Sequence, residues 1–207
     1  MEYLGTVLSI TLVSLFMILQ QVVGQPMPAK KSDDDISILV GDRPGGIAVN
    51  PNNGMVYVAN RNSDSVSVID GKTNKVLPIS ILVGEDPEGI AVNPNNDMVY
   101  VANSASSSVS VIDSKTNRVL PDDISVGDGP SGIAVNPNNN LVYVANSAIS
   151  NSVSVIDSKT NRVLPDEIIV GDEGTDPVSI AVNPNNDMVY VANTGYGNAS
   201  NSVSSYR

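Results

Sequence analysis

Four near-identical copies of one sequence block fill most of this chain of 207 residues. Each copy contains Ile-Ala-Val-Asn-Pro-Asn-Asn followed by Val-Tyr-Val-Ala-Asn, and the first isoleucine recurs at spacings of 43, 43 and 47 residues. A repeat of this length is a supersecondary unit that cannot bury its apolar faces alone and stacks on its neighbours. The four isoleucines that mark the copies are Ile47, Ile90, Ile133 and Ile180.

Each copy predicts four short antiparallel strands separated by turns. In the second copy the first three strands are expected at 90–92, 98–102 and 108–112. The middle one is apolar on both faces, as in a strand covered on two sides, and the third alternates Ser and Val, which predicts one wetter face. The fourth, at 119–126, contains Pro121 and reads as an edge strand, where proline is tolerated.

Four strands in about 43 residues predict an all-β fold, a β-propeller of four-stranded antiparallel blades. A parallel β-helix is the structural alternative, but one coil of a solenoid rarely needs four turn signals. The repeats lie near 41–83, 84–126, 127–170 and 171–207, within a propeller region that spans 36–207.

The motif Val-Tyr-Val-Ala-Asn, between Asn-Pro-Asn-Asn and Ser-Val-Ser-Val-Ile-Asp, resembles the repeat of the YVTN-family β-propellers. This chain has alanine at the position of the threonine in that motif, at Ala59, Ala102, Ala145 and Ala192. The resemblance covers 36–207 and implies a propeller of the surface-layer-like kind, with a role in extracellular recognition or cell-wall architecture.

The ends of the repeat array are out of phase. The segment 36–40 resembles the fourth strands of the later copies, while the last copy stops after its third strand. Pairing of these two ends would complete the last blade and close a four-bladed ring. The blade faces are built from Val, Ala, Ser and Ile, and the chain has no tryptophan. Such faces pack closely, which suits rings of more than four blades. Two alternatives therefore stay open: two copies that form an eight-bladed ring, and a truncated longer propeller.

Residues 1–24 read as a signal peptide or membrane anchor, because 4–19 is an uncharged and mostly apolar run. Sixteen residues are fewer than the ~20 that span a bilayer comfortably. Residues 25–35 are polar and read as a linker. These features predict an extracytoplasmic protein, either secreted or attached to the cell surface.

The loops of an antiparallel four-stranded blade emerge at two rims. The turns after the first and third strands share one rim and are nearly identical in all copies, whereas the other loops vary and share the opposite rim. Insertions that gather on one face usually mark the binding face of a repeat protein. The variable loops carry two cations, Arg43 and Arg61, and nine acids: Asp42, Asp64, Glu85, Asp86, Glu88, Asp128, Asp172, Glu173 and Asp176.

These variable loops provide the candidate site residues. Exposed aromatic side chains on loops often anchor recognition, which makes Tyr196 a candidate, although a loop tip folded back onto its blade would look the same in sequence. Asn198 lies in the one Asn-X-Ser/Thr sequon of these loops and is a candidate glycosylation site. The remaining recognition candidates are Arg43, Arg61 and Glu88, and the weak candidate ligands for Ca²⁺ are Asp172, Glu173 and Asp176.

The net charge and the missing residue types disfavour several classes of function. A net charge of −11 disfavours nucleic acid and favours cationic partners at most. The chain has no histidine and no cysteine, which removes the commonest general base and the thiol nucleophile. We therefore expect a non-enzymatic scaffold that needs no cofactor and binds an envelope protein or glycan. A carboxylate-based hydrolase or lyase, with its site in the propeller channel, is the alternative.

Overall fold

The computed structural model describes residues 36–148, 151–171, 174–195 and 201–207. Contacts within the chain group Ile38–Arg207 into one compact unit. The expected signal or anchor and the linker, residues 1–35, lie outside the described residues. Within those residues, no helix combines the length and the apolar character needed to cross a bilayer.

Each copy of the repeat forms one antiparallel sheet, in which the first, second and third strands pair in chain order. These sheets are called blades 1 to 4. Blade 1 contains β1 (Pro44–Val49), β2 (Met55–Asn60), β3 (Ser65–Asp70) and β4 (Lys75–Leu82), with a short 3-10 helix, η1 (Arg61–Ser63), between β2 and β3. Blade 2 contains β5 (Pro87–Asn93), β6 (Met98–Asn103), β7 (Ser108–Asp113), β8 (Arg118–Val119) and β9 (Ile124–Ser125). Blade 3 contains β10 (Pro130–Asn136), β11 (Leu141–Asn146), β12 (Ser152–Asp157), β13 (Arg162–Val163) and β14 (Ile168–Ile169). Blade 4 contains β15 (Thr175–Asn183), β16 (Met188–Gly195) and β17 (Ser202–Tyr206).

The predicted antiparallel blades are confirmed, and the parallel β-helix is excluded for this region because every strand pair is antiparallel. The expected edge strand of blade 2 is split into β8 and β9, which both pair with β7. Proline lacks the N–H that a continuous ladder requires, so pairing stops near Pro121 and resumes at Ile124.

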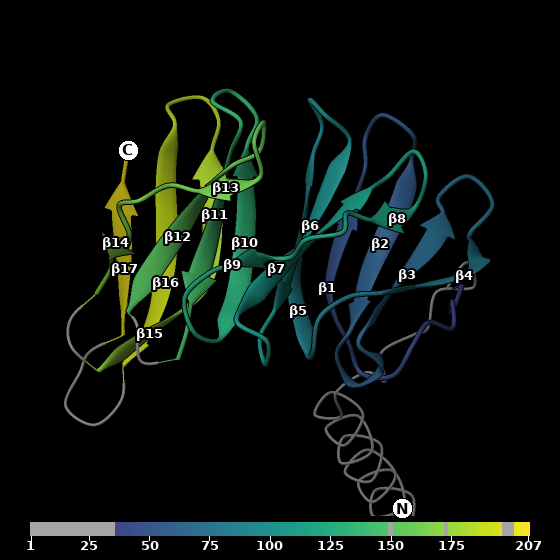
Figure 1. Ribbon diagram of the computed structural model, residues 1–207, viewed down its shortest axis with the longest axis horizontal. Helices are drawn as coiled ribbons and strands as arrows, with labels where there is room; N and C mark the ends of the chain where they lie inside the picture. The colour runs from purple at the N-terminus through teal and green to yellow at the C-terminus, as the bar shows by residue number, and fades with distance from the viewer. Residues whose placement is uncertain (1–35, 149–150, 172–173, 196–200) are drawn as a thin grey trace, which may run out of the picture. The chain divides into compact units, whose positions relative to one another are not determined.

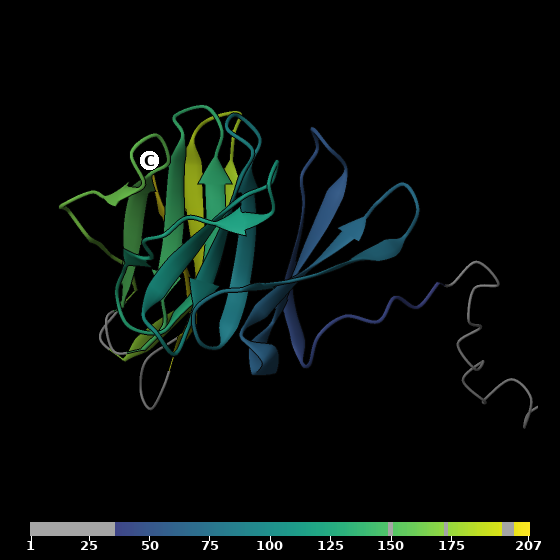
Figure 2. The same ribbon diagram turned by 45° about the vertical axis from the view of Figure 1, so that its right-hand side comes forward.

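The blades stack in chain order (Figures 1 and 2): the first strands of neighbouring blades contact each other, and the second strand of each blade contacts the first strand of the next. A separate apolar cluster fills each of the three junctions. Tyr57 and Val66 of blade 1 meet Ile90 and Val99 of blade 2, and the other two junctions repeat this arrangement. The second strand of blade 2 is buried on both faces, as its sequence predicts.

The wetter face predicted for the Ser-Val-Ser strands is wrong. Ser110 in β7 is fully buried, and its Oγ accepts a hydrogen bond of 2.9 Å from Nδ2 of Asn103. Ser108 accepts a second bond of 3.1 Å from the same amide. The serine face therefore packs against an asparagine amide, which supplies the polar partners that water would otherwise provide.

The predicted closure of a four-bladed ring is also wrong. Residues 36–40 lie in no strand, and within the described residues blade 4 has three strands, with β17 paired to β16 alone. In Figure 1, blades 1 and 4 lie at opposite ends of the row of sheets. The junctions consist mainly of valine and isoleucine with one tyrosine each, which keeps neighbouring blades close, so three junctions turn the four blades through only part of a ring.

Candidate functional site

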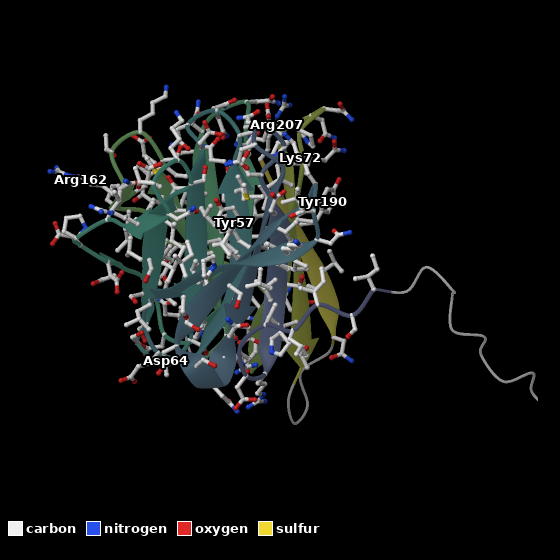
Figure 3. All side chains as sticks on the ribbon, turned by 90° about the vertical axis from the view of Figure 1, so that its right-hand side faces the viewer. Tyr57, Asp64, Lys72, Arg162, Tyr190 and Arg207 are labelled. Carbon is white, nitrogen blue, oxygen red and sulfur yellow. The ribbon has the colours of Figure 1, made fainter. Side chains whose placement is uncertain are left out.

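The loops and turns separate into two rims. In Figure 3, Asp64 lies at one end of the blades and Lys72 lies at the other. Asp64 belongs to a loop between second and third strands, and Lys72 to a turn between third and fourth strands. We call the end with the variable loops the loop rim and the end with the repeated turns the turn rim.

Buried asparagines join neighbouring blades at the turn rim. Nδ2 of Asn93 in blade 2 donates a hydrogen bond of 2.8 Å to Oγ of Ser158 in blade 3, while its Oδ1 accepts one of 3.0 Å from the backbone N–H of Asn95. One side chain therefore shapes its own turn and clamps the next blade. Asn50 makes the same bond to Ser114, at 2.8 Å.

A second asparagine of each turn adds another inter-blade bond. Nδ2 of Asn52 donates to the carbonyl oxygen of Pro94 at 2.6 Å and to Oδ1 of Asp97 at 2.8 Å. Hydrogen bonds from Asn52 and then from Asn50 favour the ionised carboxylate, which lowers the pKa of Asp97. Asn95 repeats the contact with blade 3, and Asn138 repeats it with blade 4.

The motif tyrosines of blades 1 to 3, Tyr57, Tyr100 and Tyr143, lie inside the junctions. Tyr100 is fully buried, and its hydroxyl donates a hydrogen bond of 3.0 Å to Oδ1 of Asn161 in blade 3. Burial raises the pKa of the Tyr100 phenol. Tyr57 makes the equivalent bond to Asn117, at 3.3 Å. These three tyrosines are therefore structural residues rather than members of an exposed site.

At the loop rim, an ion-pair cluster joins blades 1 and 2. The Arg61 guanidinium holds both carboxylate oxygens of Asp86, each at 2.8 Å, and its third nitrogen lies 3.1 Å from Oε1 of Glu88. This fork-to-fork geometry is the strong form of an arginine–carboxylate pair. The hydrogen bond from Arg61 lowers the pKa of Asp86.

Hydrogen bonds from side chains also fix the backbone of these loops. The N–H of Glu85 donates to Oγ of Ser106 at 2.9 Å, and the N–H of Asp86 donates to Oδ1 of Asp64 at 2.9 Å. The side chains of Glu85 and Arg43 remain exposed. The loop rim thus combines a fixed backbone with free charged side chains.

The structure brings only part of the predicted site together. Arg61 and Glu88 meet in the ion-pair cluster, and Arg43 belongs to the same rim through its carbonyl oxygen, which accepts a bond of 3.0 Å from the N–H of Arg61. Asp176 lies in β15, opposite Thr194. No three His, Cys, Asp or Glu side chains within the described ranges are grouped so that they could hold a metal ion. The candidates Tyr196, Asn198, Asp172 and Glu173 lie outside the described residues.

Two features were not found from the sequence. The first is the role of the turn asparagines that bond to the next blade, which we call asparagine clamps. The sequence predicted them only as turn residues, although their presence at the same positions in all four copies was a signal of a second role. A cavity of about 380 Å³ lies between blades 3 and 4, and Tyr143, Leu164, Tyr206 and Arg207 are among the residues that line it. The Tyr206 hydroxyl is buried without a hydrogen-bond partner in the described part of the chain, and burial raises its pKa.

Stacked, four-stranded antiparallel blades define a β-propeller protein. The model of the family "Lactonase, 7-bladed beta-propeller" matches residues 16–125, just over half of the chain, and the chain belongs to this family. A family of seven-bladed propellers also disagrees with the expected four-bladed ring. No curated protein sequence matches the chain.

Two solved structures resemble the fold. Hydrazine synthase of Kuenenia stuttgartiensis matches with a TM-score of 0.73 and 28% identity, over 85% of this chain and 49% of that one. A functionally unknown protein from Desulfotomaculum acetoxidans DSM 771 matches with a TM-score of 0.61 and 19% identity, over 79% of this chain and 55% of that one. The chain thus spans about half the length of both structures.

Proposed function

We propose that this chain is a non-enzymatic, extracytoplasmic propeller scaffold that binds a protein or glycan of the cell envelope through its loop rim. The observation that carries the proposal is the combination of a fixed loop backbone with free charged side chains. Preorganised loops reduce the entropy lost on binding. The surface-layer-like role that the YVTN-type motif implies is part of the same proposal.

Charge favours a cationic group on the ligand. The exposed Glu85, Asp64 and Asp128 outnumber the exposed cation Arg43 in the described loops, while Arg61 is already occupied by Asp86. An acidic rim attracts a basic patch and repels an acidic one. We therefore infer that basic envelope proteins, or glycans that carry amino groups, are the preferred class.

The family match supports one alternative, a carboxylate-based hydrolase that acts on lactones or related esters. Such a site needs an acid and a base that converge on a substrate. In the described residues of the loop rim, Asp86 and Glu88 converge on Arg61 instead. This arrangement favours the scaffold over the hydrolase.

The test compares binding and hydrolysis in the same preparation of the full chain. Binding to immobilised basic and acidic glycans is measured first for the unmodified chain and then for Glu85→Gln and Arg43→Asn. We expect the basic glycans to bind, Glu85→Gln to weaken that binding several-fold, and Arg43→Asn to preserve it. The matched control is Lys115→Gln on the turn rim, which should leave binding unchanged.

Hydrolysis is followed with a panel of lactones and a pH indicator. We expect no rate above that of buffer. A saturable rate that Asp86→Asn or Glu88→Gln abolishes would overturn the scaffold in favour of the hydrolase, and glycan binding that responds equally to both rims would overturn the loop rim as the binding face.

A further inference from the structure

The outer edge of blade 1 differs from that of the two blades that follow it. The fourth strand of blade 1, β4, runs without interruption from Lys75 to Leu82, whereas the same region of blades 2 and 3 is split into strands of two residues. β4 lies at the end of its sheet, beyond β3 (Figure 1), and no described strand pairs with its outer edge. Blade 1 therefore presents an open edge of eight residues on its outer side.

The two residues that follow a shared proline explain the difference between the blades. Blades 2 and 3 have Asp122-Asp123 and Asp166-Glu167 after this proline, whereas blade 1 has Ile79-Ser80. Charged residues on an edge strand oppose its pairing with another chain. In blade 1 an irregularity in the pairing with β3 accommodates Pro78, and the strand continues beyond it. The outer edge is therefore protected by acids in blades 2 and 3 and open in blade 1.

Exposed apolar side chains flank this open edge. Ile79 and Leu82 are 41% and 71% exposed. The place of blade 1 in the chain does not explain the exposure of Leu82, because its counterpart Ile169 is 68% exposed in blade 3, which has a blade on each side. Residues 76–82 contain no charged side chain. The edge thus has the apolar, uncharged character of a strand that adds to another sheet.

The backbone of β4 also directs hydrogen-bonding groups outward. The N–H of Val83 donates to the carbonyl oxygen of Asp64 in the neighbouring chain segment at 3.0 Å. Because backbone groups alternate along an antiparallel strand, those of Ile81 point toward β3, while those of Ser80 and Leu82 point away from it. These outward groups have the spacing that a further antiparallel strand requires.

We propose that the open edge of β4 pairs with β4 of a second copy of this chain, antiparallel and around a two-fold axis at Ser80. In this register the two Ser80 residues lie opposite each other. Each Leu82 lies opposite Pro78 of the other copy, whose carbonyl oxygen accepts the N–H of Leu82. The two four-stranded sheets then form one continuous sheet, and part of the exposed apolar surface of Ile79 and Leu82 is removed from water.

Charge favours a second copy as the occupant of this edge. β4 begins at the turn rim with Lys75 and ends at the loop rim, next to Asp64. Antiparallel pairing brings the turn rim of each copy beside the loop rim of the other, so the Lys75 end of one strand lies next to the Asp64 end of its partner. Both side chains are exposed, and within the described residues Lys75 forms no ion pair. Opposite charges therefore meet at both ends of this self-complementary contact.

Cross-linking of the full chain tests the register, because the chain contains no cysteine of its own. The Cα atoms of a hydrogen-bonded antiparallel pair lie about 5.5 Å apart, which a disulfide can span. We expect oxidised Ser80→Cys to form covalent dimers. The matched control is Leu82→Cys, which is highly exposed in the same strand but lies several residues from its own copy, and which should form few. Equal yields from the two variants, or no dimer from Ser80→Cys, would overturn the proposal.

Transfer of the acidic edge to blade 1 provides an independent measurement. Ile79→Asp/Ser80→Asp gives blade 1 the residues that blade 2 carries after its proline, so the repeat tolerates them. The variant places two acids of each copy in the shared edge. We expect the dissociation constant, measured by sedimentation of the full chain, to rise by more than about tenfold. The control Asp122→Asn/Asp123→Asn changes the charge of blade 2 by the same amount and should leave the constant unchanged.

Three sedimentation results would overturn the proposal. The first is a single-copy mass of the unmodified chain at all concentrations. The second is a dissociation constant that the acidic edge in blade 1 does not change. The third is an equally large change in the blade 2 control, because it would show that the association depends on overall charge rather than on β4.

Discussion

The turn rim and the loop rim are built from the same four repeats but stabilise the blades differently. At the turn rim, each junction has an asparagine clamp at the same repeat position, which donates to a serine hydroxyl in the first two junctions and to the Asp187 carboxylate in the third. At the loop rim, the Arg61 fork joins only blades 1 and 2, because Ser104 and Ser147 stand at its position in the next copies. The difference shows that the turn rim carries the architecture, while the loop rim is free to vary.

The sharpest way to break this comparison is to remove one clamp. Asn93→Ala leaves the Ser158 hydroxyl and the Asn95 N–H without their partner in a buried junction. Loss of such a partner costs about 2 kcal/mol of the free energy of unfolding. Urea denaturation measures this loss.

The matched control is Asn183→Ala in blade 4. Asn183 shapes its own turn through a bond of 3.0 Å from the N–H of Asn185, but no described blade follows it. We expect its cost to be less than half that of Asn93→Ala. Equal costs would show that the asparagines act only within their turns, as the sequence alone suggested.

The sequence predicted the parts of the fold that depend on local patterns. Apolar runs, turn residues and their recurrence gave the antiparallel blades and the buried second strands. The serine strands were misread because a serine that faces water and a serine that faces an asparagine amide produce the same alternation. Only the approach of Asn103 to Ser108 and Ser110 distinguishes them.

Properties that depend on contacts between repeats could not be predicted in the same way. The predicted ring closure was wrong because it rested on the strand-like sequence of residues 36–40. That sequence does not determine how far three junctions turn the four blades. At the site, Arg61 and Glu88 were identified as charged loop residues. Their mutual ion pair is set by how blades 1 and 2 pack, which no spacing in the sequence reveals.

A smaller effect is expected when the loop-rim ion pair is removed. Arg61→Met deletes the fork that holds Asp86, and both side chains are partly exposed. We expect a loss of about 0.5–1 kcal/mol in the free energy of unfolding, and the loss should shrink in high salt. Lys115→Met is the control, since Lys115 is highly exposed and lies 3.3 Å from Asp97. If Arg61→Met lowered the free energy of unfolding more than Asn93→Ala does, the loop rim rather than the turn rim would carry the architecture.

The response to acid sharpens the comparison further. The pKa of Asp97 is lowered by hydrogen bonds from Asn52 and Asn50. Its folded pKa lies below its unfolded pKa of about 3.9, so the stabilisation is complete above that pH and is lost as the pH falls toward the folded value. Below pH 4, the midpoint of urea denaturation should therefore fall less steeply with decreasing pH in Asn52→Ala than in the unmodified chain. Asn185→Ala, with no following blade in the described residues, should leave that slope unchanged, and a flattened slope in both would contradict the clamp.

The smallest effect on stability is expected at the free side chains of the loop rim. The Glu85 side chain is exposed, while its backbone N–H is held by Ser106. Glu85→Gln keeps the backbone bond and removes one charge, so the free energy of unfolding should change by less than about 0.5 kcal/mol. Ser106→Ala, in contrast, removes the bond that fixes the loop and retains the charge.

The two variants also test whether the loop rim recognises its ligand through a preorganised acidic surface. If it does, both variants weaken binding. The salt dependence of binding is then reduced in Glu85→Gln and unchanged in Ser106→Ala. Titrations at two salt concentrations distinguish the two, and equal salt responses would show that charge and loop order do not act separately at this rim.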